Sequence, residues 1–430
     1  MSILALSPHE GFHRASIAIS LDYETSAPHG NIANLYSRLR GHLLNPISKV
    51  VKKPINLTFC YGMGYGMRKG ADNIMHILQK YNAHATWFCT GHVLLKENKD
   101  RKAFHINQIL PYATKDAGFT DIVTWRRNKP TFFYEPYGDY KKYPYWYFGD
   151  QASKLKTMGE DIECHTFSHP YVALEAADNV KIDIEDWQNT AEINGFRRAN
   201  ILAFPFCGDA YKYYHRLDLI TSLGKNIAGE DYIITPLSKD IINILKNAGI
   251  ELLVRCGSKY QEQFSVFKPY DNSELYYMPD IGFSNSAEDI NQLSDAIKAV
   301  IDRNASANIW LHPINVFTID EIQNFEMLIR SLLEKQKEEL LWFDTISTIW
   351  EHFKKVQQCN MEISKKDKNG YIVNIINKNN SHIENLGIDI YSPNLSIDGH
   401  RSDLLRKQNK IVIKKIDAGN HISFDCKILN

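Results

Sequence analysis

Helical and strand-like segments alternate along most of this chain, and this alternation limits the fold more than any other feature. Apolar residues recur with helical spacing over residues 70–81, and the β-prone run 85–91 follows directly. Four further pairs are predicted, namely helix 151–159 with strand 161–165, helix 238–248 with strand 250–254, helix 286–303 with strand 307–311, and helix 319–336 with strand 340–343. Such alternation places parallel strands beneath helices. Repeated units of this kind predict an α/β barrel or a partial barrel.

Two regions interrupt the alternation. Residues 27–66 are irregular and end in the glycine-rich run 61–66. We interpret this run as a flexible loop because its spacing differs from that of phosphate-binding glycine motifs. Residues 100–150 are crowded with aromatic side chains. They are interpreted either as a substrate-facing loop or as a small satellite core.

The composition changes near residue 355. Residues 360–430 contain short β-prone runs separated by Asn, Gly, Ser and Asp, which predicts a small β-sandwich. We therefore expect a barrel domain over residues 1–355, with insertions at 27–66 and 100–150, and an accessory all-β domain over residues 360–430.

Composition excludes several classes of protein. Fifty basic and fifty acidic residues cancel, so no overall field favours nucleic acid or an anionic membrane. Seven scattered cysteines without a C-x-x-C pair argue against a disulfide framework or a cysteine zinc site. No segment approaches the roughly 18 apolar residues of a membrane span, and the first residues do not resemble a secretory signal. We expect a cytoplasmic protein with no nucleic-acid partner and no transmembrane segment. The sequence does not indicate an oligomeric state.

Polar side chains follow several of the predicted strands at their carboxyl ends. Asp22 and Glu24 follow strand 14–22, whereas His165, His169 and His312 follow two later strands. Active sites of α/β barrels are built at this rim. Two histidines at positions i and i+4 share one face of a helical turn. Two neutral imidazoles so placed can bind one metal ion such as Zn²⁺.

The order of these motifs resembles that of the polysaccharide deacetylase family, which is also called the NodB homology domain or carbohydrate esterase family 4. The resemblance covers about residues 14–350. It rests on Asp22-Tyr23-Glu24, Ala85-Thr86-Trp87-Phe88, His165-Thr166-Phe167-Ser168-His169, the turn at Pro205-Phe206, and Leu311-His312. It implies a deformed (β/α) barrel and a divalent metal, most often zinc.

The resemblance also implies roles for individual residues. Asp22 would be the catalytic base and His312 the general acid. The metal ligands would be Glu24, His165 and His169. Substrate contacts would come from Pro205, Phe206, Trp310 and Leu311, and a backbone N–H near Phe206 would help to hold the oxyanion.

Three departures from the family pattern matter. The family usually has two adjacent aspartates, but Tyr23 occupies the second position, so Glu24 is assigned as third ligand with Asp22 as the alternative. Arg197 and Arg198 precede Pro205 by more than the usual spacing, which leaves the arginine that orients the base open. Trp310 replaces the leucine of the late Leu-x-His motif, and Asp280 is the candidate for orienting the acid.

Three functions fit this reading. The first is metal-dependent removal of an N-acetyl group from an amino sugar in a glycan or glycan precursor. The second is hydrolysis of a non-sugar, cyclic amide on the same fold. The third is a catalytically inactive relative that binds carbohydrate.

Overall fold

The structure is a computed structural model of the 430-residue chain. It describes residues 3–25, 61–99, 138–170, 172–212, 234–256, 264–283, 285, 287–392, 394–397, 402–407 and 409–429. Most of the two predicted insertions lies outside the described residues.

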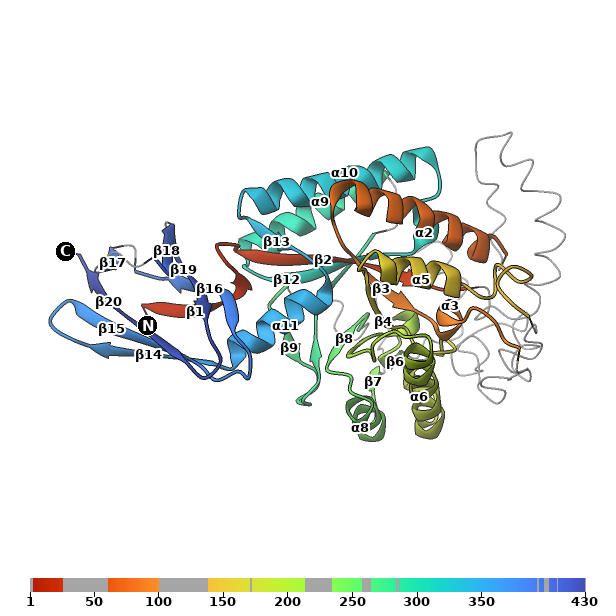
Figure 1. Ribbon diagram of the computed structural model, residues 1–430, viewed down its shortest axis with the longest axis horizontal. Coiled ribbons are helices and arrows are strands. Elements are labelled where there is room, and N and C mark those ends of the chain that lie inside the picture. Colours follow the sequence, from red (N-terminus) through yellow and green to blue (C-terminus); the bar gives the residue numbers. More distant parts are fainter. Residues whose placement is uncertain are drawn as a thin grey trace.

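A curved sheet of parallel strands forms the centre of the larger part of the molecule (Figure 1). Its strands are β2 (Ala15–Tyr23), β3 (Thr86–Cys89), β4 (Asp161–Cys164), β5 (Ile201–Ala203), β8 (Leu252–Val254) and β12 (Ser306–Leu311). They pair side by side in the order β12–β2–β3–β4–β5–β8. β13 (Leu341–Phe343) pairs with the first residues of β2, at Ala15–Ile17.

One interrupted strand closes the sheet into a ring. β10 (Tyr276–Tyr277) is parallel to β8, and β11 (Asp280–Gly282) is parallel to β12. Met278 N–H donates to the carbonyl of Leu253 at 3.1 Å. Asn308 N–H then donates to the carbonyl of Pro279 at 2.9 Å. The strand therefore pairs with β8 up to Met278 and with β12 from Pro279 onward. The structure therefore confirms the deformed α/β barrel. β9 (Lys268–Pro269) pairs with β10, and β6 (Ala210–Lys212) pairs with β7 (Ile234–Pro236) in a separate hairpin.

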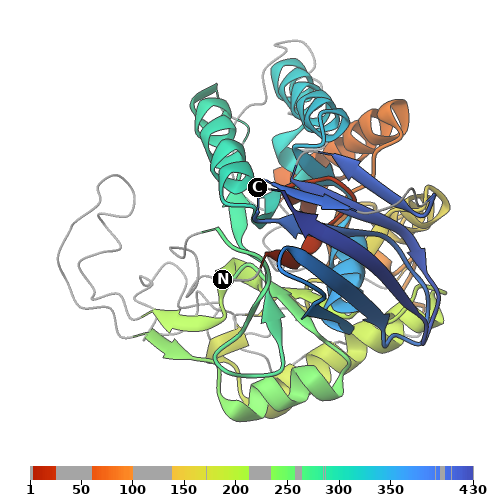
Figure 2. The same ribbon diagram turned by 90° about the vertical axis from the view of Figure 1, so that its left-hand side faces the viewer.

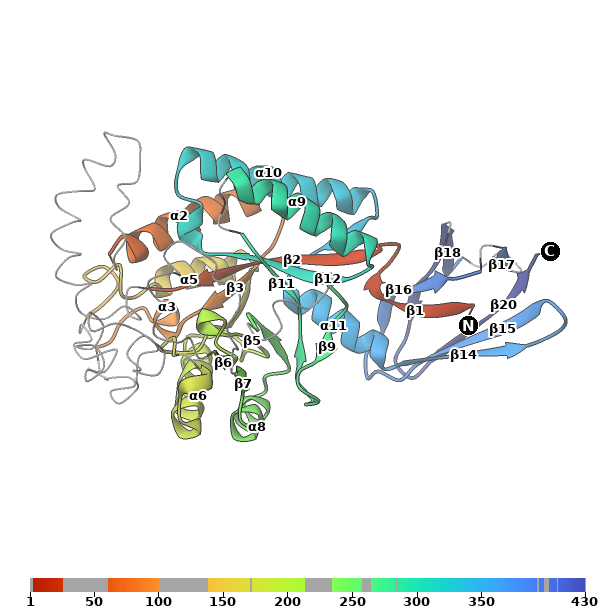
Figure 3. The same cartoon turned by 180° about the vertical axis from the view of Figure 1, so that it is seen from behind.

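Helices cover the ring from outside. α2 (Tyr61–Tyr81), α9 (Ala287–Asp302) and α10 (Ile319–Lys337) lie on one side, and α6 (Ala177–Ile193) and α8 (Lys239–Asn247) lie on the other (Figures 1 and 3). α3 (Gly91–Leu94) and α5 (Gly149–Thr157) follow β3 and precede β4, and α11 (Ile346–Gln357) follows β13. The 3-10 turns η5 (Val172–Leu174), η6 (Pro205–Cys207) and η8 (Pro313–Asn315) follow β4, β5 and β12.

Residues of each strand alternate between two apolar clusters. Ile17, Ile19, Leu21 and Tyr23 of β2 pack in the core beneath the helices. Ala18 belongs to the inner cluster with Phe88 of β3. This period of two is the ordinary geometry of a strand, and it places even-numbered residues of β2 inside the ring.

The glycine-rich run 61–66 is helical, so its interpretation as a flexible loop was wrong. It forms the first turns of α2. A Cβ atom on Gly66 would lie 2.6 Å from the side chain of Ile314, and one on Gly70 would lie 1.7 Å from the carbonyl oxygen of Pro313. Glycine therefore lets α2 approach η8, and this packing offsets its low helix propensity.

The remaining strands form a β-sandwich of two four-stranded sheets (Figure 2). One sheet contains β14 (Cys359–Lys365), β15 (Gly370–Asn377), β20 (His421–Ile428) and β17 (Leu395–Ile397). The other contains β1 (Leu4–Glu10), β16 (Ile383–Ile390), β19 (Lys410–Ile416) and β18 (Leu404–Lys407). The two sheets share one apolar core.

The N-terminal strand corrects one part of the expected boundary. Residues 1–355 were assigned to the barrel, but β1 pairs antiparallel with β16 of the sandwich. Apart from this strand, the all-β part begins at Cys359. Among the helices of the described residues, none is long and apolar enough to cross a membrane.

Candidate active site

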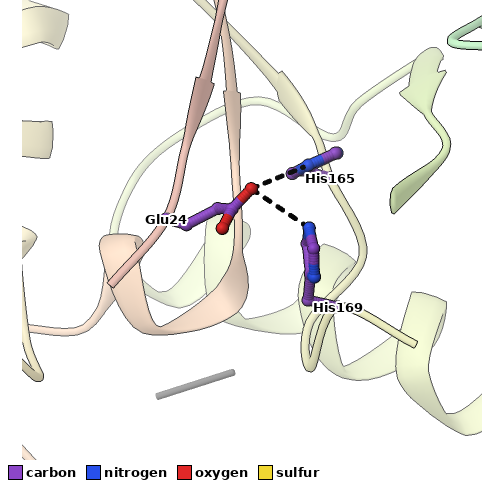
Figure 4. A group of neighbouring side chains, drawn as sticks. All are labelled: Glu24, His165 and His169. Carbon is purple, nitrogen blue, oxygen red and sulfur yellow. Dashed lines mark ion pairs between the residues drawn. The ribbon is translucent and has the colours of Figure 1, made fainter. Parts of the chain in front are cut away.

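Three ligand-bearing side chains meet at the carboxyl end of the barrel strands (Figure 4). Glu24, His165 and His169 each offer a ligand atom, and these atoms all lie within 4.8 Å of one another. Glu24 Oε1 is 3.1 Å from His169 Nε2 and 3.6 Å from His165 Nε2. All three residues are buried. One carboxylate and two imidazoles form a donor set that suits a divalent metal such as zinc.

Strand alternation explains why Tyr23 is not part of this cluster. Its ring packs edge-on against Trp87, with 5.5 Å between ring centres, and its hydroxyl donates to Gln151 of α5. The side chain therefore lies in the core beneath the helices. Asp22 and Glu24, on either side of Tyr23, lie within reach of His312 and the histidine pair.

The two histidines lie in a loop after β4 rather than on a helical turn. Thr166 and His169 both adopt positive φ angles of 61°. Asp183 of α6 holds the loop, because its carboxylate accepts the N–H of Phe167 at 2.5 Å and that of Ser168 at 3.1 Å. The two histidines do lie together, but in a loop, so the helical turn assumed in the i, i+4 argument was wrong.

A hydrogen bond sets the ring orientation of His165. Its Nδ1 lies 2.9 Å from the carbonyl oxygen of Ala203, an acceptor that requires the proton on Nδ1. Its Nε2 faces Glu24. A backbone carbonyl that fixes the tautomer in this way is a usual feature of metal-binding histidines.

Asp22 is held by an arginine that the sequence reasoning missed. Arg255, directly after β8, donates from Nη2 to Asp22 Oδ1 at 2.8 Å and from Nε to Oδ2 at 3.0 Å. Arg255 is buried. The candidates Arg197 and Arg198 instead bind Asp161 at 2.8 Å and Glu192 at 2.9 Å. Arg255 follows predicted strand 250–254, so the strand-end argument used for the histidines would have found it.

Asp280 contacts this arginine in the structure. Its Oδ1 accepts from Arg255 Nη1, and its Oδ2 accepts the backbone N–H of Arg255, both at 2.6 Å. Asn308 Nδ2 donates to the same Oδ1 at 2.7 Å. Asp280 was expected to orient His312, but in the structure it pairs with Arg255 instead.

The charges around Arg255 favour an ionised Asp22. Burial raises the pKa of Asp22, but the charges of Arg255, His165 and His312 outweigh it, and the pKa lies below its ordinary value. Burial is the dominant effect for Asp280, whose pKa is raised despite Arg255. Of the two acids beside Arg255, Asp22 is thus the stronger.

His312 completes the polar rim. Its Nε2 lies 3.5 Å from Glu24 Oε1, and its backbone N–H donates to Asn315 Oδ1 at 3.0 Å, which fixes the start of η8. Burial lowers the pKa of His312, but the hydrogen bond and charge of Glu24 raise it, and the net pKa lies above the ordinary value.

The four predicted substrate contacts are not equivalent in the structure. Trp310 lies two residues before His312, and its ring faces Arg255. Leu311 packs in the core beneath the helices, so the prediction that it faces substrate was wrong. Successive residues of a strand point to opposite faces, and Leu311 therefore points away from the face that carries Trp310. Pro205 is buried at the start of η6, and the side chain of Phe206 lies outside the described residues.

Comparison with known proteins gives a consistent family. Residues 48–216 match the family model described as polysaccharide deacetylase. No curated protein matches the chain.

Several solved structures resemble the chain at low sequence identity. A putative polysaccharide deacetylase from Mycobacterium smegmatis is 10% identical with a TM-score of 0.47, over 84% of this chain and 100% of that chain. A probable polysaccharide deacetylase from Pseudomonas aeruginosa PAO1 is 13% identical with a TM-score of 0.44, over 80% and 91%. Puue allantoinase is 13% identical with a TM-score of 0.47, over 81% and 93%.

Proposed function

We propose that this chain, which carries a polysaccharide deacetylase domain over residues 48–216, removes an N-acetyl group from an amino sugar in a glycan or glycan precursor, with zinc as its metal. The observation that carries the proposal is the buried cluster of Glu24, His165 and His169 beside a carboxylate held by an arginine. Such a site combines ligands for a metal with separate groups for proton transfer.

The residues present fit a divalent metal. Glu24 brings a carboxylate into a buried site between two imidazoles, and the contact of His165 Nδ1 with the Ala203 carbonyl leaves Nε2 as the ring nitrogen that faces the cluster. When bound, the metal would polarise the amide carbonyl and make water more acidic. Glu24, His165 and His169 would be its protein ligands.

Asp22 is suited to accept a proton from the attacking water. It stays ionised at neutral pH because Arg255 lowers its pKa. Each carboxylate oxygen has two acceptor sites, so the fork of Arg255 leaves capacity on both. Arg255 also fixes the orientation of the carboxylate, because a bidentate pair restricts rotation.

His312 is suited to protonate the departing amine. Its Nε2 faces the metal ligands at 3.5 Å from Glu24 Oε1, and its raised pKa favours the protonated imidazole. Protonation of the nitrogen is required because an amide anion is a very poor leaving group. Asp22 and His312 would therefore act as base and acid on the same amide.

The test uses pure protein, freed of metal and then loaded with Zn²⁺. Acetate release is measured from N-acetylglucosamine oligomers, nucleotide-linked N-acetyl amino sugars and, as the competing class, cyclic amides. We expect release from one sugar class that depends on Zn²⁺ and is lost in His165→Ala. His382→Ala, on the exposed surface of the sandwich, is the matched control.

Two results would overturn the proposal. Turnover of cyclic amides alone would assign the second chemistry to this site. Failure of the protein to bind any divalent metal in elemental analysis, together with no acetate release, would indicate a carbohydrate-binding relative without activity. Location in the cytoplasm remains a prediction of the sequence.

A further inference from the structure

The indole N–H of Trp310 is a buried hydrogen-bond donor. Its Nε1 is shielded from solvent and has no acceptor among the residues that the structure describes. An unpaired buried N–H is costly and uncommon in native proteins, and calls for an explanation such as a ligand that pairs with it. Trp310 belongs to the end of β12, two residues before His312.

The ring of Trp310 is held in a fixed position. The guanidinium carbon of Arg255 lies 4.5 Å from the centre of the ring. The ring of His312 lies edge-on to it, with 5.7 Å between centres and 71° between planes. Arg255 is itself anchored by Asp22 and Asp280, so the surface against which the indole packs is in place before any substrate binds.

The register of Trp310 in β12 also places this side chain near the groups proposed to react. Trp310 pairs with Ser20 of β2, and Asp22 lies two residues farther along the same strand. Side chains two residues apart share one face of a strand. Trp310 therefore shares the inner face with Asp22 and lies between Arg255 and His312, next to the groups proposed to transfer protons.

We propose that Trp310 Nε1–H donates a hydrogen bond to the carbonyl oxygen of the acyl amide that binds beside His312. This inference rests on the proposed function, because it concerns the same substrate. A donor aimed at an oxygen that gains negative charge stabilises the transition state more than the ground state. Trp310 would thus be a catalytic residue whose contribution appears mainly in kcat.

The kinetic test replaces the indole with a ring that lacks the donor. Trp310→Phe is compared with the wild type on the sugar substrate found in the acetate-release panel. Loss of one such donor predicts a fall in kcat of about 100- to 1,000-fold with KM changed less than about three-fold. Metal content and thermal stability are measured on the same samples. A kcat within two-fold of the wild type would overturn the inference.

Trp146→Phe is the matched control. Within the described part of the chain, Trp146 Nε1 is also buried without a hydrogen-bond partner, but its ring packs with Tyr147, Leu95, Tyr140 and Tyr143 rather than with Arg255. The same chemical change there is expected to leave kcat unaltered. If Trp310→Phe does not fold, β-(3-benzothienyl)alanine inserted at position 310 removes the N–H and keeps the ring size.

A second readout does not depend on turnover. Indole N–H signals of ¹⁵N-labelled, Zn²⁺-loaded protein are recorded with and without acetohydroxamate, an amide analogue. We expect one signal, absent from Trp310→Phe, to move downfield when the analogue is added. An unmoved Trp310 signal with saturated analogue would overturn the inference.

The two readouts separate the inference from the proposed function. If no sugar releases acetate but the Trp310 signal moves, the proposed substrate fails and the hydrogen bond stands. If acetate is released while the signal is unmoved and kcat is unchanged, the hydrogen bond fails and the proposed function stands.

Discussion

Orientation of single side chains decides which residues of the first motif reach the histidine pair. Tyr23 occupies the position where the resemblance implies an acid, but it packs against Trp87 and Phe148 beneath the helices. Glu24 reaches the histidines instead. The sequence alone allowed Glu24 or Asp22 as the third ligand, and the strand geometry favours Glu24, because Asp22 is bound by Arg255.

An acid placed at position 23 is therefore expected to harm the protein without improving the site. Tyr23→Asp would place a carboxylate among apolar side chains, which costs several kcal/mol of unfolding free energy. Zn²⁺ affinity is expected not to rise. Tyr23→Phe keeps the ring and loses only the hydrogen bond to Gln151, so it should cost about 1 kcal/mol. Urea unfolding and zinc titration measure both effects, and tighter zinc binding in Tyr23→Asp would contradict this account.

Arg255 is expected to act through geometry as well as through charge. Arg255→Lys keeps the positive charge but loses the fork that holds both oxygens of Asp22. We expect kcat to fall about 10- to 100-fold, the loss commonly caused by misplacing a catalytic group.

The pH profile of the same variant gives an independent check. Because Arg255 lowers the pKa of Asp22, weakening the pair raises that pKa. Activity that needs ionised Asp22 should then be lost at a higher pH on the acid side. Arg198→Lys, which changes an exposed arginine paired with Glu192, is the control. An acid limb that does not move would indicate that Asp22 is not the base.

Secondary-structure elements were largely predictable because each has a local cause. The predicted helix 319–336 is observed as Ile319–Lys337, and Thr318 and Glu321 form its capping box. Predicted strand 307–311 is observed as Ser306–Leu311. The start of α2 was not predictable from local preference, because glycine disfavours helix and the compensating contacts come from η8, far away in the sequence.

The close packing of α2 against η8 predicts the effect of a substitution at Gly70. A methyl group on Gly70 would overlap the carbonyl oxygen of Pro313, which directly follows His312. Gly70→Ala is therefore expected to destabilise the protein by about 1–3 kcal/mol, despite the better helix propensity of alanine. Activity should fall as η8 shifts. His76→Ala, on the exposed face of the same helix, should change neither quantity. Stabilisation by Gly70→Ala in urea unfolding would contradict the observed packing.

At the scale of the whole molecule, the N-terminal strand joins the two parts of the chain. β1 belongs to the sandwich, and β2, which follows it, is the central strand of the barrel. The pairing between residues 4–10 and 386–390 could not be predicted from the local sequence pattern, because a short β-prone run does not indicate which distant strand it pairs with. The sequence did predict both architectures, since each depends on the local pattern of apolar residues.

Two histidines, the buried His9 and the half-buried His352, lie where these two parts meet. His9 of β1 donates from Nε2 to the carbonyl oxygen of Asn304, at the start of the segment leading to β12, at 3.0 Å. Burial, with a smaller contribution from the charge of nearby Lys410, lowers the pKa of His9 to about 3. Burial likewise lowers the pKa of His352, on α11, to about 4. Both imidazoles are thus neutral in the folded protein.

These pKa values predict loss of stability in acid. An unfolded histidine binds a proton below about pH 6.5, whereas the folded protein excludes it until the pH approaches the lowered pKa. The stabilisation is fully present above pH 6.5. It is lost as the pH falls toward 4, by about 1.4 kcal/mol per pH unit for each histidine. Free energies of unfolding from urea titrations at pH 7.5, 6 and 5 measure this slope.

The same titrations in His9→Gln and His352→Gln assign the effect. Glutamine keeps a polar side chain but does not titrate, so each variant should have a shallower pH dependence below 6.5 than the wild type. The double variant should lose about twice as much of the slope as either single variant, provided that the two sites act independently. His382→Gln, an exposed change on the sandwich, should leave the slope unaltered. If all variants follow the wild-type slope, acid sensitivity arises from other groups, and the neutral histidines do not stabilise the contact between barrel and sandwich.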